Sequence, residues 1–169
     1  MTFSIAGFCR DTGQFGTAIS SSSICVASRC AFVASGKGAV LTQNVTNPVL
    51  GQLGTRLLDE GKSADVVLDE LIASEVFPQW RQLLVLDAKG ASAMHSGSET
   101  LGINATSRGR DCVAGGNMLA NEHVTTVMVR TFEEHRGELA ERLLAALDAG
   151  LAIGGEMGPV HSAGLKVTG

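Results

Sequence analysis

Two pairs of helical segments interrupt a chain that otherwise consists of short strands and tight turns, and this alternation restricts its fold most. Apolar residues recur with helical spacing in four segments: 50–58, 67–72, 124–128 and 139–151. Asn47 before Pro48 is typical of a helix start, and Ser63 is placed to cap the second helix. The sequence therefore predicts two blocks of strands, each followed by a helix pair, and a closing strand at 162–167.

The turns between the strands indicate antiparallel hairpins. Strands are expected at 2–9, 14–23, 31–34, 39–42, 82–86, 91–95 and 112–117. Arg10-Asp11-Thr12-Gly13 joins the first two, and Ser35-Gly36-Lys37-Gly38 joins the next two. We expect residues 24–30 to be irregular and Gly115-Gly116 to form a tight corner. Because hairpins oppose a parallel βαβ sheet, the prediction is an α+β domain spanning 1–169, a four-layer αββα sandwich of two antiparallel sheets flanked by helix pairs.

The chain opens Met1-Thr2, and Thr2 begins the first predicted strand. Initiator methionine is normally removed when a small residue follows, which would leave Thr2 with a free α-amine and a hydroxyl. An α-amine has a reference pKa of about 7.7–8.0, so a useful fraction is unprotonated at neutral pH. One residue would then supply both a nucleophile and its base.

Composition excludes several classes of function. A net charge of −4, without a lysine and arginine run, argues against nucleic-acid binding. No apolar run approaches the roughly 18 residues of a membrane helix, and no signal sequence is recognisable, so we expect a cytoplasmic protein. Four cysteines without a Cys-x-x-Cys pair and four scattered histidines indicate neither a disulfide framework nor a metal site.

Several short motifs, in order along nearly the whole chain, resemble a known family. They are Thr2-Phe3-Ser4-Ile5, Arg10-Asp11-Thr12-Gly13, Gly38 to Gln43, Asn47-Pro48, His95-Ser96-Gly97, Gly116 to Leu119 and Ser162-Ala163. The set is similar to the uncharacterised bacterial domain of unknown function 1028, placed among the N-terminal-nucleophile (Ntn) hydrolases. This resemblance implies the Ntn fold and, by analogy, amide-bond hydrolysis. The stretch 155–162 and the serine run 20–23 depart from the family pattern, which leaves the substrate open.

Chemistry assigns candidate roles to seven residues. Thr2 would attack the acyl carbon, and Asn117 is the first candidate for the donor that stabilises the oxyanion, although a turn asparagine is equally compatible with its position. Ser20 and Ser21 are candidates to bind the amine or the substrate. His95 is either a general acid or a hydrogen-bonded sheet histidine. Glu156 and Ser162 are placed beside the amine of Thr2, near the last motif.

Three functions remain open at this point. The first is an N-terminal-threonine amidohydrolase that acts on a small-molecule amide without a cofactor. The second is a catalytically silent binding or assembly protein that keeps Met1, and the third is a cysteine-dependent enzyme. We also expect a homo-oligomer, by analogy with small proteins of this superfamily.

Overall fold

The computed structural model describes residues 1–169 and contains two antiparallel sheets. The strands of the first are β1 (Thr2–Cys9), β2 (Gln14–Ser21), β7 (Ala105–Gly109), β8 (Cys112–Asn117) and β9 (Ser162–Thr168). Those of the second are β3 (Ala31–Ala34), β4 (Gly38–Asn44), β5 (Arg81–Asp87) and β6 (Ser92–Ser96). The order in space is β7-β8-β1-β2-β9 and β3-β4-β5-β6. β1 therefore lies at the centre of the five-stranded sheet.

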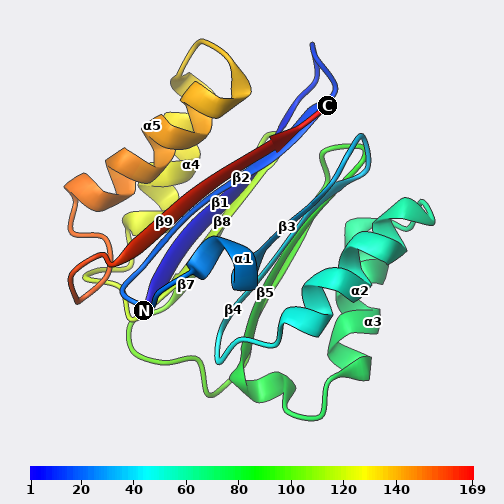
Figure 1. Cartoon of the computed structure of the whole chain (residues 1–169). Helices are drawn as coiled ribbons and strands as arrows, with labels where there is room; N and C mark the ends of the chain where they lie inside the picture. Colours follow the sequence, from blue (N-terminus) through cyan, green and yellow to red (C-terminus); the bar gives the residue numbers. More distant parts are fainter.

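Five α-helices accompany the sheets. They are α1 (Val26–Cys30), α2 (Pro48–Asp59), α3 (Ala64–Ser74), α4 (Val124–Glu134) and α5 (Leu139–Ala152), with a 3₁₀ turn η1 (Pro78–Trp80) before β5. The sheets face each other, α4 and α5 cover the outer side of the five-stranded sheet, and α2 and α3 cover the outer side of the other (Figure 1). The predicted antiparallel sheets and helix pairs are therefore present.

Three apolar layers hold these elements together, and β1 contributes to two of them. Phe3 and Ile5 pack against α4 and α5, whereas Ala6 lies in the layer between the sheets. A third layer packs Val40 and Leu83 against α2 and α3. Successive strand residues point to opposite faces, so both faces of β1 are buried. This places the beginning of β1 inside the protein.

The structure corrects three local expectations. Residues 26–30, expected to be irregular, form the short helix α1. Gly115 and Gly116 lie within β8, where an added Cβ would meet Leu84 at 2.9 Å or Leu119 at 2.6 Å, so close packing requires glycine there. Ser63 precedes α3, but its side chain makes no capping hydrogen bond.

A buried ion pair braces the start of β5. Arg81 Nε donates to Glu75 Oε2 at 2.9 Å, and the two side chains are only 10% and 4% exposed. Arg81 also donates to the Val45 carbonyl, and Asn47 Nδ2 donates to Glu75. The hydrogen bond from Arg81 is the main reason why the pKa of Glu75 falls to about 2.

We expect Glu75→Gln to lower the free energy of unfolding at neutral pH by about 3 kcal/mol, because it leaves a buried guanidinium without its counter-charge. Because the pKa of Glu75 is lower in the folded protein than in the unfolded chain, its ionised form stabilises the fold at any pH above the unfolded-state pKa near 4.5. This stabilisation is lost as the pH falls towards about 2. The difference from the parent protein should therefore shrink below pH 4.5. Urea unfolding at several pH values measures it. Glu70→Gln, which removes a half-exposed partner of Lys62, is the control and should cost less than about 1 kcal/mol; equal losses would contradict the prediction.

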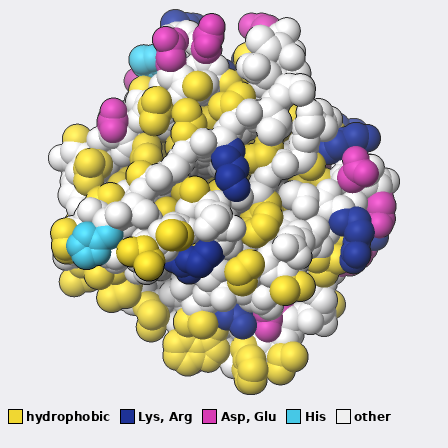
Figure 2. All heavy atoms as spheres, in the orientation of Figure 1, with side chains coloured by type: hydrophobic (Ala, Val, Ile, Leu, Met, Phe, Trp, Pro, Cys, Tyr) yellow, Lys and Arg dark blue, Asp and Glu magenta, His cyan; other side chains and the backbone are white.

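Exposed hydrophobic side chains gather at one end of the molecule. They belong to the segments around the β4–α2 loop and η1: Val45, Val49, Val76 and Phe77. The lower end of the space-filling view shows a group of hydrophobic side chains in this region (Figure 2). No helix combines the length and apolar character needed to cross a bilayer. Self-association stays a prediction.

Candidate functional site

Four polar residues form a row across neighbouring strands at one end of the five-stranded sheet. Thr2 lies opposite Asn117 of β8 and opposite Ser21 of β2, and Ser21 in turn lies opposite Ser162 of β9. Residues directly opposite each other in an antiparallel pair share a face, so the four side chains leave the sheet on the same side. Because Phe3 faces the helices, this row faces the other sheet.

Thr2 is 6% exposed, and its hydroxyl is held by neighbours. Thr2 Oγ1 lies 2.6 Å from the Met1 carbonyl oxygen and 3.1 Å from Ser21 Oγ. Ser21 Oγ lies 2.5 Å from the same carbonyl oxygen and accepts a hydrogen bond from the Ser23 amide. The candidate nucleophile therefore lies beside an acyl oxygen that two hydroxyls can bind.

The side chain of Asn117 is fixed by a glutamine between the sheets. Gln82 Oε1 accepts from Asn117 Nδ2 at 3.2 Å and from Gln43 Nε2 at 2.8 Å. Gln82 Nε2 donates to Ser96 Oγ and to the Gly116 carbonyl, both at 2.9 Å. All four hydrogen-bonding positions of the Gln82 amide are used, so its orientation is determined. Asn117 Nδ2 has a second N–H that makes no hydrogen bond to the protein.

This network continues to β1 and was not foreseen. Ser4 Oγ donates to Gln43 Oε1 at 2.7 Å. Ser4 is two residues after Thr2, so the two side chains lie on the same face of β1. Gln43 and Gln82 are fully buried. The sequence did contain a signal for this network: each of the apolar strands β4 and β5 carries a glutamine, Gln43 and Gln82. A buried amide needs hydrogen-bond partners, so such glutamines indicate a polar network between the sheets. The residues that orient Asn117 therefore lie in the four-stranded sheet, far from it in sequence.

Glu156 lies in a segment that runs past the start of β1 after α5. It forms a β-bridge with Leu119, and the segment later bonds to β2 through the His161 amide and the Ser21 carbonyl. Glu156 is 5% exposed, and neither carboxylate oxygen has a hydrogen-bond partner. Burial raises the pKa of Glu156, while the nearby chain amine of Met1 opposes this rise. The predicted position of Glu156 near the chain end agrees with this arrangement.

The Met1 side chain lies against the same segment. A Cβ added to Gly158 would meet Met1 Cε at 2.7 Å and Sδ at 3.2 Å, with Ser22 Cβ at 3.9 Å. Met1 therefore occupies a space bounded by Gly158, Ser22 and Thr2, and its amine is near enough to Glu156 to affect that carboxyl group.

Two candidate residues lie away from this group. Ser20 is opposite Phe3, so it points to the helix side of its sheet, contrary to our expectation that it lies beside Thr2. His95 is opposite Leu83, which packs against α2 and α3, and its Nε2 lies 3.0 Å from the Pro78 carbonyl oxygen. The alternative reading of His95, as a hydrogen-bonded sheet histidine, fits this placement. Strand alternation explains both results.

Ser162 belongs to the row, but its hydroxyl is hydrogen-bonded to the connection between β2 and α1. Its Oγ donates to the Ser23 carbonyl at 2.6 Å and accepts from the Val26 amide at 3.1 Å, at the start of α1. Ser162 is therefore placed to position the segment next to Ser21.

The cysteines and possible metal ligands are dispersed. Cys25 is exposed, Cys9 is half-buried, and Cys30 and Cys112 are buried. Burial raises the pKa of the Cys30 thiol and raises that of Cys112 to about 12, which leaves them protonated. No three side chains of histidine, cysteine, aspartate or glutamate converge as a metal site would require.

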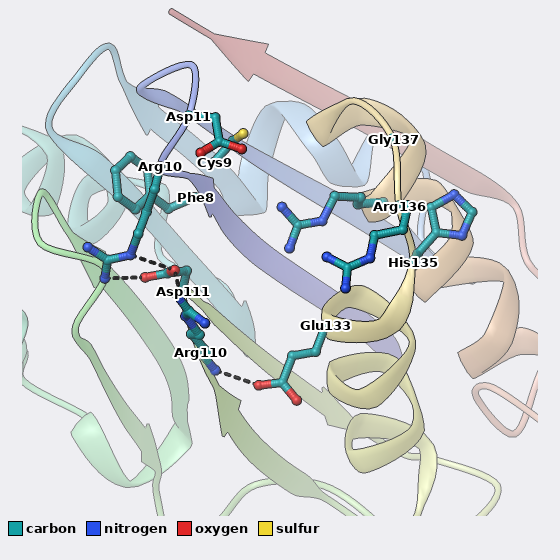
Figure 3. Close-up of a pocket in the computed structure, with 11 residues that line it drawn as sticks. Phe8, Cys9, Arg10, Asp11, Arg110, Asp111, Glu133, His135, Arg136 and Gly137 are labelled. Carbon is teal, nitrogen blue, oxygen red and sulfur yellow. Dashed lines mark hydrogen bonds and ion pairs between the residues drawn. The ribbon is translucent and has the colours of Figure 1, made fainter.

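A cavity lies at the opposite end of β1. It has a volume of about 630 Å³, is open to solvent on one side, and is bordered by the β1–β2 turn, the β7–β8 turn and the connection from α4 to α5 (Figure 3). Thr2 and Cys9 are the two ends of β1, about 23 Å apart at roughly 3.3 Å per residue. This cavity is therefore separate from the row around Thr2.

Comparison with known proteins identifies relatives without a described activity. The model of the family of unknown function DUF1028 matches residues 2–169. The crystal structure of protein SPO2555 from Silicibacter pomeroyi, assigned to DUF1028, is similar with a TM-score of 0.92 at 27% sequence identity. The similarity covers 98% of this chain and 72% of that one. No protein with a curated description matches the chain.

Proposed function

Because the chain belongs to DUF1028, a family of unknown function, its chemistry must be inferred from the site, and we propose that it is an N-terminal-threonine amidohydrolase. The substrate is a small amide whose C–N bond is cleaved after Met1 has been removed. The observation that carries the proposal is the buried Thr2 hydroxyl, 3.1 Å from Ser21 Oγ and opposite an asparagine whose amide is fixed.

The proposal includes membership of the Ntn-hydrolase superfamily. Two facing antiparallel sheets between two helix pairs, with a threonine at the start of a central strand, resemble that layered fold. This part of the argument is an analogy of fold, and the chemistry rests on the residues around Thr2.

The reaction has two stages. Thr2 Oγ1 adds to the substrate carbonyl carbon while the freed α-amine of Thr2 takes the hydroxyl proton. The second N–H of Asn117 Nδ2 donates to the resulting oxyanion. Collapse breaks the C–N bond, the amine passes the proton to the leaving nitrogen, and an acyl ester remains on Thr2. Water then adds to the ester with the amine as base, which releases the acid and restores the hydroxyl.

Met1 indicates the class of acyl group. It is an aminoacyl group on the nitrogen of Thr2, whereas the acyl-enzyme would carry its acyl group on the hydroxyl of the same residue. The Met1 carbonyl oxygen contacts both hydroxyls, and the Met1 amine is one of three groups, with the Ser22 amide and His161, that lower the pKa of the buried Glu156 against the effect of burial. A substrate that replaces Met1 would place an ammonium group near Glu156. We therefore assign the substrate as an amide of an α-amino acid, with Glu156 as the binding residue for its amine.

This assignment can be tested with two substrates, alanine p-nitroanilide and propionic acid p-nitroanilide, which differ only in the α-amino group. Intact mass first establishes that Met1 is absent. A charge-assisted contact of about 1.5–3 kcal/mol predicts a kcat/KM roughly 10- to 100-fold higher for the alanine compound. Glu156→Gln should remove that preference. Because the carboxylate must be ionised, KM for the alanine compound should rise as pH falls through the raised pKa of Glu156, and that for the propionyl compound should not.

The outcomes separate the two parts of the proposal. Equal hydrolysis of both compounds would refute the amino-acid assignment but leave the hydrolase intact. No hydrolysis of either by protein that lacks Met1 would refute the hydrolase. Retention of Met1 in the native protein would favour the catalytically silent alternative, because the Thr2 nitrogen is then an amide.

A further inference from the structure

The cavity at the Cys9 end of β1 is predominantly polar. Only Phe8 and Cys9 among its lining residues are apolar, whereas four arginines and a histidine line it together with three acidic residues. Its volume of about 630 Å³ is in the range of pockets that hold small molecules. A ligand that fits this space must therefore be polar and mainly bound through charged groups.

Two of the three acidic residues of the cavity, Asp111 and Glu133, have hydrogen-bond partners on one side, whereas the Asp11 carboxylate has none. Asp111 accepts from Arg10 Nε at 2.8 Å and from Arg10 Nη2 at 2.6 Å. Arg110 Nε is 3.9 Å from Asp111, and its backbone amide donates to Glu133 at 2.6 Å. The Arg10–Asp111 pair neutralises Arg10 and connects the two turns that form one wall, and the bond from Arg110 to Glu133 connects the β7–β8 turn to α4 (Figure 3).

The opposite wall carries two arginines without a counter-charge. Arg136 follows α4, makes no ion pair or hydrogen bond, and points into the space between the walls (Figure 3). Arg142 of α5 has no acidic partner; its guanidinium lies 4.0 Å from the centre of the Phe132 ring and donates to the Phe132 carbonyl. These contacts hold Arg142 in place without neutralising it. The lining holds four arginines and three carboxylates, so it carries one excess positive charge in a chain whose net charge is −4.

We propose that this cavity is a second binding site, which takes a small anion bearing carboxylate or phosphate groups through Arg136 and Arg142. Guanidinium groups bind both kinds of anion through paired N–H donors. The site does not depend on the chemistry at Thr2, because it lies at the other end of β1.

Cys9 provides a reporter in the wall of the cavity. A hydrogen bond from the Thr12 side chain lowers the pKa of its thiol, and the charge of Arg142 lowers it further. An anion bound at Arg142 would oppose that effect and also cover the sulfur, so the thiolate would react more slowly. Cys25 is exposed and its side chain does not cap α1, which makes Cys25→Ser a suitable background.

The test measures alkylation of Cys9 by iodoacetamide in the Cys25→Ser protein, with the modified residue located by mass spectrometry. Inorganic phosphate and succinate are the probes, and sodium chloride at equal ionic strength is the control. We expect phosphate, succinate or both to slow the reaction saturably by about fivefold or more at millimolar concentration. Protection by phosphate alone would indicate a phosphoryl ligand, and protection by succinate alone a carboxylate.

Arginine variants show whether protection comes from the proposed contacts. Arg136→Gln should abolish it, and because Arg136 is exposed without partners, this variant should fold normally. Arg142→Gln should also abolish protection. Because the charge of Arg142 lowers the pKa of Cys9, its loss changes the basal alkylation rate, so the rates with and without anion are compared within that variant. Arg130→Gln, an exposed arginine of α4 outside the cavity, should keep full protection. No protection by either anion up to about 50 mM, or protection that survives in the Arg136 and Arg142 variants, would overturn the proposal.

Discussion

Replacing Thr2 by alanine is expected to lower kcat for amide hydrolysis by on the order of 10⁴-fold or more. In the proposed reaction the Thr2 hydroxyl is the only group of the protein that bonds to the acyl carbon. Its loss removes the contact to Ser21 at 3.1 Å and should cost only about 1 kcal/mol of stability. Steady-state hydrolysis of alanine p-nitroanilide measures the effect, and thermal unfolding verifies the fold.

Thr2→Ser is the matched control. It keeps the hydroxyl, and both serine and alanine are small enough for methionine removal, so intact mass can establish the same chain end in all three proteins. We expect the serine variant to stay within about tenfold of the parent. Full activity in the alanine variant after loss of Met1 would show that another nucleophile acts, and the half-buried Cys9 would then be tested by alkylation.

Replacing Asn117 by alanine should lower kcat by on the order of 10²–10³-fold and change KM little, because its amide is assigned to the transition state. Asn117 lies opposite Thr2, and Gln82 accepts one of its two N–H groups. The variant leaves Gln82 Oε1 with its bond from Gln43, so the network between the sheets should survive. Separate values of kcat and KM distinguish this role from substrate binding.

Ser4→Ala provides the comparison within the same network. It removes the donor to Gln43 Oε1, at the end of the network away from Asn117. We expect a stability loss of about 1 kcal/mol and a change in kcat of less than about tenfold. If Asn117→Ala lowers kcat no more than Ser4→Ala, Asn117 does not stabilise the oxyanion.

The sequence by itself determined the local elements and the position of Thr2. Apolar spacing and turn residues predicted the hairpins and both helix pairs, and Asn47 does cap α2 through its side chain. These features depend on residues close together in the chain, for which local backbone preferences are sufficient. The same reasoning placed Thr2 at the start of a strand, whereas the expected position of Glu156 beside the chain end came from the family resemblance.

The tertiary structure alone decided which side chains meet. Strand alternation places neighbouring residues on opposite faces, but which face turns inward depends on pairing between distant strands. Thus Ser21 faces the other sheet with Thr2, whereas Ser20 faces the helices. Gln82 likewise reaches Asn117 only because the two sheets stack. The arginine cavity also joins turns and a helix connection from both halves of the chain, and no local pattern brings such segments together.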